Sequence, residues 1–248
     1  MRNVAQKRGA DAPAKQPRVS LRTAATEDSL RKMALAQLTP ALVLSAVPWR
    51  VIRSRRGQRH MPGLYWSSTT GAHVGYESRL ELARLLLADM DRDVVAIAEQ
   101  PFMVFDDTRR HVPDFLLGRA DGSVVIVNVK PADKLAEPRI ADALAWAGEV
   151  FATRGWEHEI WSGTDAQVLA NVRFLSGYRR ASLLHAPDIA TARALPECDL
   201  DVAGAEAALL GAGVSEPRPV VLHLLWSGAL RTDLGRPLTS SSELEVSR

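Results

Sequence analysis

Residues 111–131 read HVPDFLLGRADGSVVIVNVKP, and the rest of the expected fold is built around them. A short apolar strand is predicted at 115–117 and a longer, β-branched strand at 124–129. The residues between them, 118–122, contain two glycines and an aspartate, which favour a turn. The stretch is therefore predicted to be a β-hairpin.

Three polar residues at the open end of this hairpin suggest a site: Asp114, Asn128 and Lys130. If the strands pair about a centre near Asp121, Asp114 falls opposite Asn128. A carboxylate, an amide and an ammonium would then converge at one end of an otherwise apolar sheet. Burying them costs free energy unless they satisfy one another or bind an ion. We therefore interpret this end of the hairpin as an active site.

The composition of the 248-residue chain narrows the class of protein. Cys198 is the only cysteine, so an intramolecular disulfide and a cysteine-rich zinc site are excluded. No apolar run approaches the roughly 18 residues that a membrane span requires. The formal net charge of +2 indicates little by itself. We expect a soluble, cytoplasmic protein.

The segments around the hairpin predict an α/β fold. An apolar stripe predicts a helix over 75–90, and a strand follows at 94–105, interrupted at Glu99-Gln100-Pro101. After the hairpin, a helix is predicted over 138–154 and a strand over 156–161. A helix that leads from the hairpin to one more strand implies a crossover, so the sheet is expected to be mixed and flanked by helices.

Three parts are predicted along the chain. Residues 1–44 are a basic, partly disordered arm that either solubilises the protein or adds phosphate contacts. Residues 45–164 form the main α/β domain, and residues 165–248 form a small, mostly helical region. A hairpin predicted at 230–238 suggests that this region resembles a winged helix, and 239–248 is expected to be frayed.

An arginine-rich segment precedes the α/β domain. It contains no acidic residue, and its arginines are Arg50, Arg53, Arg55, Arg56 and Arg59. Such a run is often a solvated face, but the planar guanidinium group can also donate two hydrogen bonds to one phosphate. Its position ahead of the predicted site favours contact with the DNA backbone.

The predicted helix over 75–90 carries two acidic residues four positions apart, Glu77 and Glu81, which would share one face. Both could be surface residues, with Glu81 paired to Arg84. Alternatively, Glu81 joins Asp114 as an oxygen ligand of a hard divalent ion.

Together these groups fit one type of reaction. Asn128 could add a neutral ligand or bind the attacking water, and Lys130 could stabilise charge on a phosphate. The combination indicates metal-dependent hydrolysis of a phosphodiester, against the alternative of a structural hairpin with an incidental lysine.

The spacing of Pro113-Asp114 and Asn128-Val129-Lys130 resembles the PD-(D/E)xK motif of restriction-endonuclease-like nucleases. Four segments in order resemble TnsA, the endonuclease subunit of heteromeric transposases: Glu81-Leu82-Ala83, Ala96-Ile97-Ala98-Glu99-Gln100, Asp114-Phe115-Leu116 and Asn128-Val129-Lys130-Pro131-Ala132. The resemblance covers roughly residues 50–164. It implies a restriction-endonuclease-like core with a mixed β-sheet flanked by helices.

The resemblance also implies roles for individual residues. The metal, Mg²⁺ or Mn²⁺, would be held at Glu81, Asp114 and Val129, and the catalytic lysine would be Lys130. Asn128 stands at the motif position that is acidic in most nucleases of this fold and glutamine in the TnsA prototype.

The partners that the resemblance implies are the double-stranded DNA of transposon ends, a DDE transposase (TnsB-like) and an AAA+ ATPase regulator (TnsC-like). The chain would cut the 5′ strand at each end and associate with the nucleoid when bound to DNA. Two alternatives are a stand-alone restriction or repair nuclease and an inactive adaptor that only binds DNA or a transposase.

Overall fold

The computed structural model describes residues 16–24, 26, 29–50, 61–194 and 200–246. Within these ranges, no helix is long and apolar enough to cross a bilayer. The elements in chain order are β1 (Arg18–Arg22), β2 (Leu30–Ala34), η2 (Leu35–Gln37), α1 (Pro40–Leu44), β3 (Gly63–Ser67), β4 (Ala72–Tyr76), α2 (Arg79–Met90), β5 (Val94–Glu99), β6 (Met103–Phe105), β7 (Arg110–His111), β8 (Phe115–Arg119), β9 (Val124–Val129), η3 (Ala132–Lys134), α3 (Pro138–Ala152), β10 (Glu157–Trp161), α4 (Ala166–Leu175), η4 (Ser176–Tyr178), η5 (Ala181–Leu183), α5 (Ala186–Arg193), β11 (Leu200–Asp201), α6 (Val202–Gly211), α7 (Pro217–Trp226), β12 (Leu230–Arg231) and β13 (Glu243–Val246).

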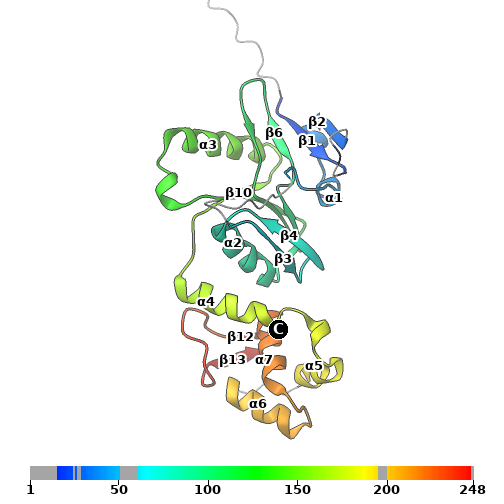
Figure 1. The fold of residues 1–248 in the computed structure, drawn as a ribbon, viewed down its shortest axis with the longest axis vertical. Helices are drawn as coiled ribbons and strands as arrows, with labels where there is room; N and C mark the ends of the chain where they lie inside the picture. Colours follow the sequence, from blue (N-terminus) through cyan, green and yellow to red (C-terminus); the bar gives the residue numbers. More distant parts are fainter. Residues whose placement is uncertain (1–15, 25, 27–28, 51–60, 195–199, 247–248) are drawn as a thin grey trace, which may run out of the picture.

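A four-stranded sheet in the order β10-β9-β8-β5 forms the centre of the α/β part (Figure 1). β8 is antiparallel to both β5 and β9, whereas β9 and β10 are parallel and are connected through α3. The sheet is therefore mixed, as predicted. In the β8–β9 hairpin, Phe115 pairs with Val127, so the next pair outward is Asp114 with Asn128. The register predicted from the sequence is confirmed.

Both faces of this sheet are covered, which explains the β-branched sequence of β9. Val127 shares a core with Leu85 of α2 on one face, and Ile126 shares a core with Phe151 of α3 on the other. A strand buried on both faces requires apolar residues at nearly every position. Asn128, which has no exposed surface, is the polar exception in β9.

The N-terminal segment is part of the fold, which corrects the prediction of an arm that extends to residue 44. β1 pairs with β2 and with β6, in a second sheet ordered β2-β1-β6-β7. Val19 and Leu21 are buried in the same core as Phe151. Their alternation is short and lies among basic residues, so the local pattern did not reveal a strand that forms through pairing with β6. Residues 1–15 of the predicted arm lie outside the described residues.

Helix α2 begins later than predicted. β4 continues to Tyr76, and Ser78 then caps the helix: its Oγ accepts a hydrogen bond from the backbone N–H of Glu81 at 3.1 Å. Glu77 therefore precedes the helix, and the prediction that Glu77 and Glu81 share a helical face is wrong. The helical pattern of residues 75–78 gave a wrong prediction because Gly75 and Tyr76 pair with β3 and Ser78 caps α2.

The C-terminal part is mostly helical, as predicted, and lies below the α/β part in Figure 1. Its α7 is buried from Val220 to Trp226 and packs against α4, α5 and α6. The hairpin predicted at 230–238 is wrong in its second strand. The strand β12 pairs instead with β13, which lies in the stretch that was predicted to be frayed. Between them Asp233 accepts a hydrogen bond from the Gly235 N–H at 2.9 Å, which bends the chain out of an extended strand. The winged-helix resemblance stays a prediction.

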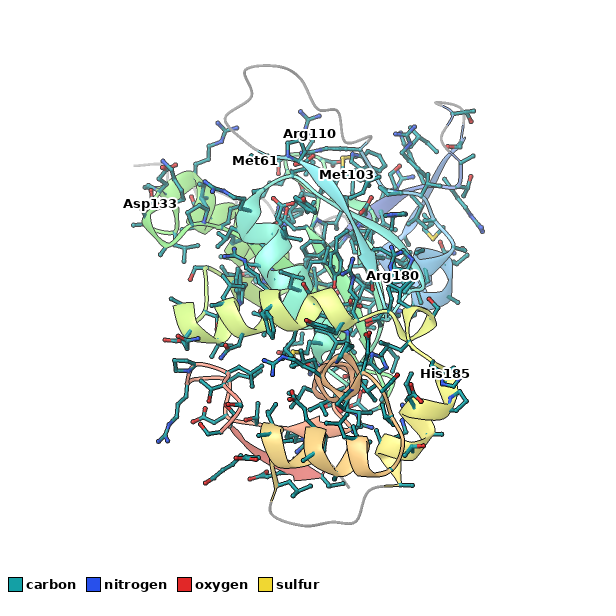
Figure 2. All side chains as sticks on the ribbon, turned by 60° about the horizontal axis from the view of Figure 1, so that its bottom comes forward. Met61, Met103, Arg110, Asp133, Arg180 and His185 are labelled. Carbon is teal, nitrogen blue, oxygen red and sulfur yellow. The ribbon has the colours of Figure 1, made fainter. Side chains whose placement is uncertain are left out.

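Polar and aromatic contacts join the two parts near the β3–β4 hairpin. The Trp226 indole N–H donates a hydrogen bond to Ser68 Oγ at 2.9 Å. The Arg180 guanidinium lies 4.3 Å from the centre of the Trp66 ring, and Figure 2 shows Arg180 where the C-terminal part meets this hairpin. The C-terminal part also contacts α2 through α4, so it packs on the side of the sheet that α2 covers.

Candidate active site

Asp114 and Lys130 meet at the open end of the β8–β9 hairpin. The backbone N–H of Val129 donates a hydrogen bond to Asp114 Oδ2 at 2.7 Å, and Lys130 Nζ lies 3.3 Å from the same oxygen. Lys130 Nζ also donates to the Val129 carbonyl at 2.9 Å. The Asp114 side chain is only 16% exposed and that of Lys130 32%, so their attraction is stronger than in a surface ion pair. The convergence predicted from the register is present.

Asn128 is held from three directions. Its Oδ1 lies 2.9 Å from His111 Nε2 and 3.0 Å from His158 Nε2, and its Nδ2 makes a long contact of 3.5 Å with Asp114 Oδ2. Burial lowers the pKa of both His111 and His158. Both rings are therefore neutral at pH 7.

His111 stands only three residues before Asp114 in the chain, whereas the sequence analysis missed His158. His158 reaches Asn128 from β10, and it pairs with Ile126 in the parallel β9–β10 register, so it lies on the Asn128 face of the sheet. That parity could have indicated His158, but only once the register between the two parallel strands was known.

Glu81 lies near Asp114 but is occupied by the start of its own helix. Its Oε2 accepts a hydrogen bond from the Glu77 backbone N–H at 2.7 Å, and its Oε1 accepts one from Ser78 Oγ at 2.9 Å. Together with the hydrogen bond from the Glu81 N–H to Ser78 Oγ, these contacts fix the start of α2. Burial raises the pKa of Glu81, and the charge of Asp114 raises it further.

Arg84 does not pair with Glu81. Its guanidinium instead forms two hydrogen bonds with Glu159 of β10, at 2.8 and 2.7 Å, and so ties α2 to the edge of the central sheet.

The central segment of the chain is similar to a known protein family. Residues 91–163 match the family model described as "TnsA-like endonuclease N terminal". This segment is therefore similar to the N-terminal domain of TnsA-like endonucleases, and we call it the TnsA-like domain. The match contains the whole central sheet with Asp114, Asn128 and Lys130, and it leaves out α2 and the C-terminal part. No curated protein matches the chain. The TnsA-like domain implies a nuclease with a role related to transposition.

Two further polar residues of the TnsA-like domain lie beside Asp114: Glu99, the last residue of β5, and Gln100, which follows it. The backbone N–H of Gln100 donates a hydrogen bond to the Asp114 carbonyl at 2.8 Å, and Gln100 has a φ of 37°, in the left-handed region. Burial raises the pKa of Glu99 to about 7, and the charge of Glu77 adds to the shift. The sequence indicated these residues only as an interruption of a strand and as part of the family resemblance.

Replacing Glu99 by glutamine is expected to stabilise the protein at alkaline pH. Because the folded state raises the pKa of Glu99 above its ordinary value of 4.5, the protonated acid favours folding and its ionised form opposes it. The associated stability is complete below pH 4.5 and is lost as the pH rises through 7. At pH 8, the Glu99→Gln variant should therefore gain up to about 3 kcal/mol in free energy of unfolding.

Urea denaturation at pH 5 and pH 8 would measure this gain. Glu149→Gln, at an exposed position of α3, provides the matched control and should leave the pH dependence unchanged. A Glu99→Gln variant with the wild-type pH dependence would contradict the prediction.

The arginine-rich segment is only partly described. Arg50 is exposed, and its Nη1 lies 3.9 Å from Glu77 Oε2. Arg50 therefore lies beside the acidic residues next to the candidate site. Arg53, Arg55, Arg56 and Arg59 lie outside the described residues. Their predicted contact with DNA stays a prediction.

The residues expected to hold a metal are only partly assembled. Among the described residues, no three His, Cys, Asp or Glu side chains are grouped for a metal ion. The hydrogen bonds that described residues make to the Asp114 carboxylate all end on Oδ2. Asp114 Oδ1 therefore fits a cation, whereas Glu81 would have to exchange its capping contacts for one.

Proposed function

We propose that the chain is the endonuclease subunit of a heteromeric transposase and hydrolyses phosphodiester bonds to cut the 5′ strand at transposon ends. The observation that carries the proposal is the arrangement of Lys130 Nζ and the Val129 N–H on Asp114 Oδ2 within a TnsA-like domain. This arrangement orients one oxygen of the carboxylate and directs an ammonium at the same point.

A divalent ion, Mg²⁺ or Mn²⁺, is proposed to bind at Asp114, with Glu81 and the Val129 carbonyl as further ligands. When bound, it would activate a water molecule and neutralise charge on the phosphate. Carboxylate and carbonyl oxygens are the ligands that such hard ions prefer. Burial, and further the nearby charge of Asp114, raise the pKa of Glu81, and a bound cation would offset the repulsion between the two carboxylates.

The chain's own residues have separate tasks in this proposal. Lys130 Nζ stabilises the negative charge that develops on the phosphate oxygens and holds Asp114 in place. Arg50 and the arginines that follow it hold the DNA backbone by charge-assisted hydrogen bonds. Since phosphate contacts carry no sequence information, recognition of the transposon end is assigned to the partner subunits.

The partners are proposed to be a DDE transposase (TnsB-like) and an AAA+ ATPase regulator (TnsC-like). The TnsA-like domain supports this proposal because it implies a role related to transposition.

Cleavage of transposon-end DNA by the full chain together with its transposase tests the proposal. The two strands carry different labels, and the reaction is run with Mg²⁺ and with a chelator. We expect cutting of the 5′ strand only, and only with Mg²⁺. Efficient cutting without the transposase would favour a stand-alone nuclease. DNA binding without any cutting would favour an inactive adaptor.

A further inference from the structure

The carboxamide of Asn128 is enclosed by two histidines from different sheets. His111 comes from β7 of the second sheet, and His158 comes from β10 of the central sheet. An amide oxygen can only accept hydrogen bonds, so each histidine must carry its proton on Nε2. A neutral imidazole has one N–H group, and burial keeps both rings neutral. The contacts therefore fix the tautomer of both rings.

The opposite orientation of the Asn128 amide is disfavoured. It would place the amide oxygen 3.5 Å from Asp114 Oδ2, where the amino group lies in the structure. Two acceptor oxygens would then face each other, and Oδ2 already accepts hydrogen bonds from Val129 and Lys130. The histidines and Asp114 thus select the same orientation of the amide.

Residues of α3 also restrict the position of the His158 ring. A Cβ atom at Gly148 would lie 2.9 Å from His158 Nδ1, closer than real Cβ atoms approach. Glycine in a helix interior weakens the helix relative to alanine, but here it leaves space for the ring. The Phe151 ring packs edge-on against His158 at 5.6 Å between ring centres. α3 therefore holds His158 against Asn128.

We propose that His111 and His158 are positioning residues that retain the oxygen of Asn128, so that Asn128 offers its amino group to Asp114 and does not bind the metal ion. The part that concerns the metal rests on the proposed function. Asn128 then supports Asp114 Oδ2 and leaves Oδ1 for the ion. The residue at the otherwise acidic position of the motif is thus a hydrogen-bond donor in this chain.

Long-range ¹H–¹⁵N correlation spectra of the imidazole rings in the full chain test the first part. We expect His111 and His158 to have the Nε2–H tautomer. His223 provides an internal reference, because its Nδ1 lies 2.8 Å from the Tyr178 carbonyl and must carry the proton. An Nδ1–H tautomer at His111 or His158 would overturn the proposal.

Adding Mg²⁺ to the same sample tests the second part. If Asn128 is not a ligand, both tautomers stay unchanged when the ion binds. A change to Nδ1–H on binding would show that the amide has turned its oxygen to the ion, and would overturn the proposal. Since the spectra require neither DNA nor cleavage, the tautomers of the free protein remain informative if the nuclease function is not found.

Gly148→Ala tests the supporting role of α3 without altering any site residue. The added methyl group should displace the His158 ring, remove its tautomer preference and weaken Mg²⁺ binding about 10-fold, measured by calorimetry. Gly211→Ala, at a helical glycine with no atom within 4 Å of the added Cβ, is the matched control and should change neither. Unchanged His158 signals and Mg²⁺ affinity in a folded Gly148→Ala variant would overturn the proposed positioning.

Discussion

Asp114→Asn is expected to lower the rate of 5′-strand cleavage by roughly 1,000-fold while the fold is retained. The Asp114 Oδ2 atom accepts from Val129 and Lys130, and Oδ1 is the atom proposed to face the metal ion. An amide has only one acceptor oxygen, so either the two donors or the ion would face an NH₂ group. The charge that attracts both the ion and Lys130 is also lost. Strand-specific cleavage with the transposase partner measures the effect.

Lys130→Met in the same assay separates charge from shape, because methionine retains most of the apolar stem. Lys130→Met should abolish detectable cleavage, whereas DNA binding should persist in both variants. Asp133→Asn is the matched control: Asp133 is exposed in η3, three residues after Lys130, and is labelled in Figure 2. Cleavage at the wild-type rate by Asp114→Asn or Lys130→Met would show that the site has been assigned incorrectly.

Asp89→Ala is expected to lower the free energy of unfolding by at least about 3 kcal/mol. Asp89 is 6% exposed, and its carboxylate accepts hydrogen bonds from the side chains of Tyr65, Ser67 and Ser68 and from the backbone N–H groups of Ser68 and Thr69. Removing it leaves the buried hydroxyls of Tyr65 and Ser67 and the partly buried donors of Ser68 and Thr69 without their acceptor. These bonds tie the β3–β4 hairpin to α2, the helix whose first turn carries Glu81.

Thermal and urea denaturation measure this loss, which should lower the Tm by roughly 6–12 °C. Asp142→Ala, at an exposed position of α3, is the control and should change the free energy by less than about 0.5 kcal/mol. Burial alone would raise the pKa of Asp89, but the hydrogen bonds from Ser67, Thr69 and Tyr65 outweigh it and lower the pKa. The stability due to Asp89 is therefore present above pH 3.8 and falls as the pH drops through the lowered value. An Asp89→Ala variant as stable as the control would contradict this account.

Asp89 and Glu99 show why the effect of a buried carboxylate could not be predicted from the sequence. Both are acidic residues that lie next to apolar residues in the chain. Asp89 gains five hydrogen bonds from the β3–β4 hairpin, whereas Glu99 Oε2 is buried with no hydrogen-bond partner among the described residues. Their pKa values consequently shift in opposite directions.

Local and long-range interactions also explain which helices and strands could be predicted from the sequence. Helix α3 was predicted closely because its apolar stripe, Pro138 at its start and Gly155 after its end are local signals. The start of α2 was predicted too early, since pairing of β4 with β3 overrides the helical pattern of 75–78. β1 was missed because it is stabilised by pairing with β6, more than 80 residues away in the chain.

The sequence by itself determined the β8–β9 hairpin, its register, and the meeting of Asp114, Asn128 and Lys130 at its open end. A short turn and a period of two residues specify all three, and both are local properties of the chain. Only the tertiary structure decided what surrounds these residues. His111 and His158 arrive from two other strands and take the oxygen of Asn128, and the start of α2 occupies both oxygens of Glu81. These contacts depend on how sheets and helices pack across long stretches of chain, and no local pattern of residues specifies that packing.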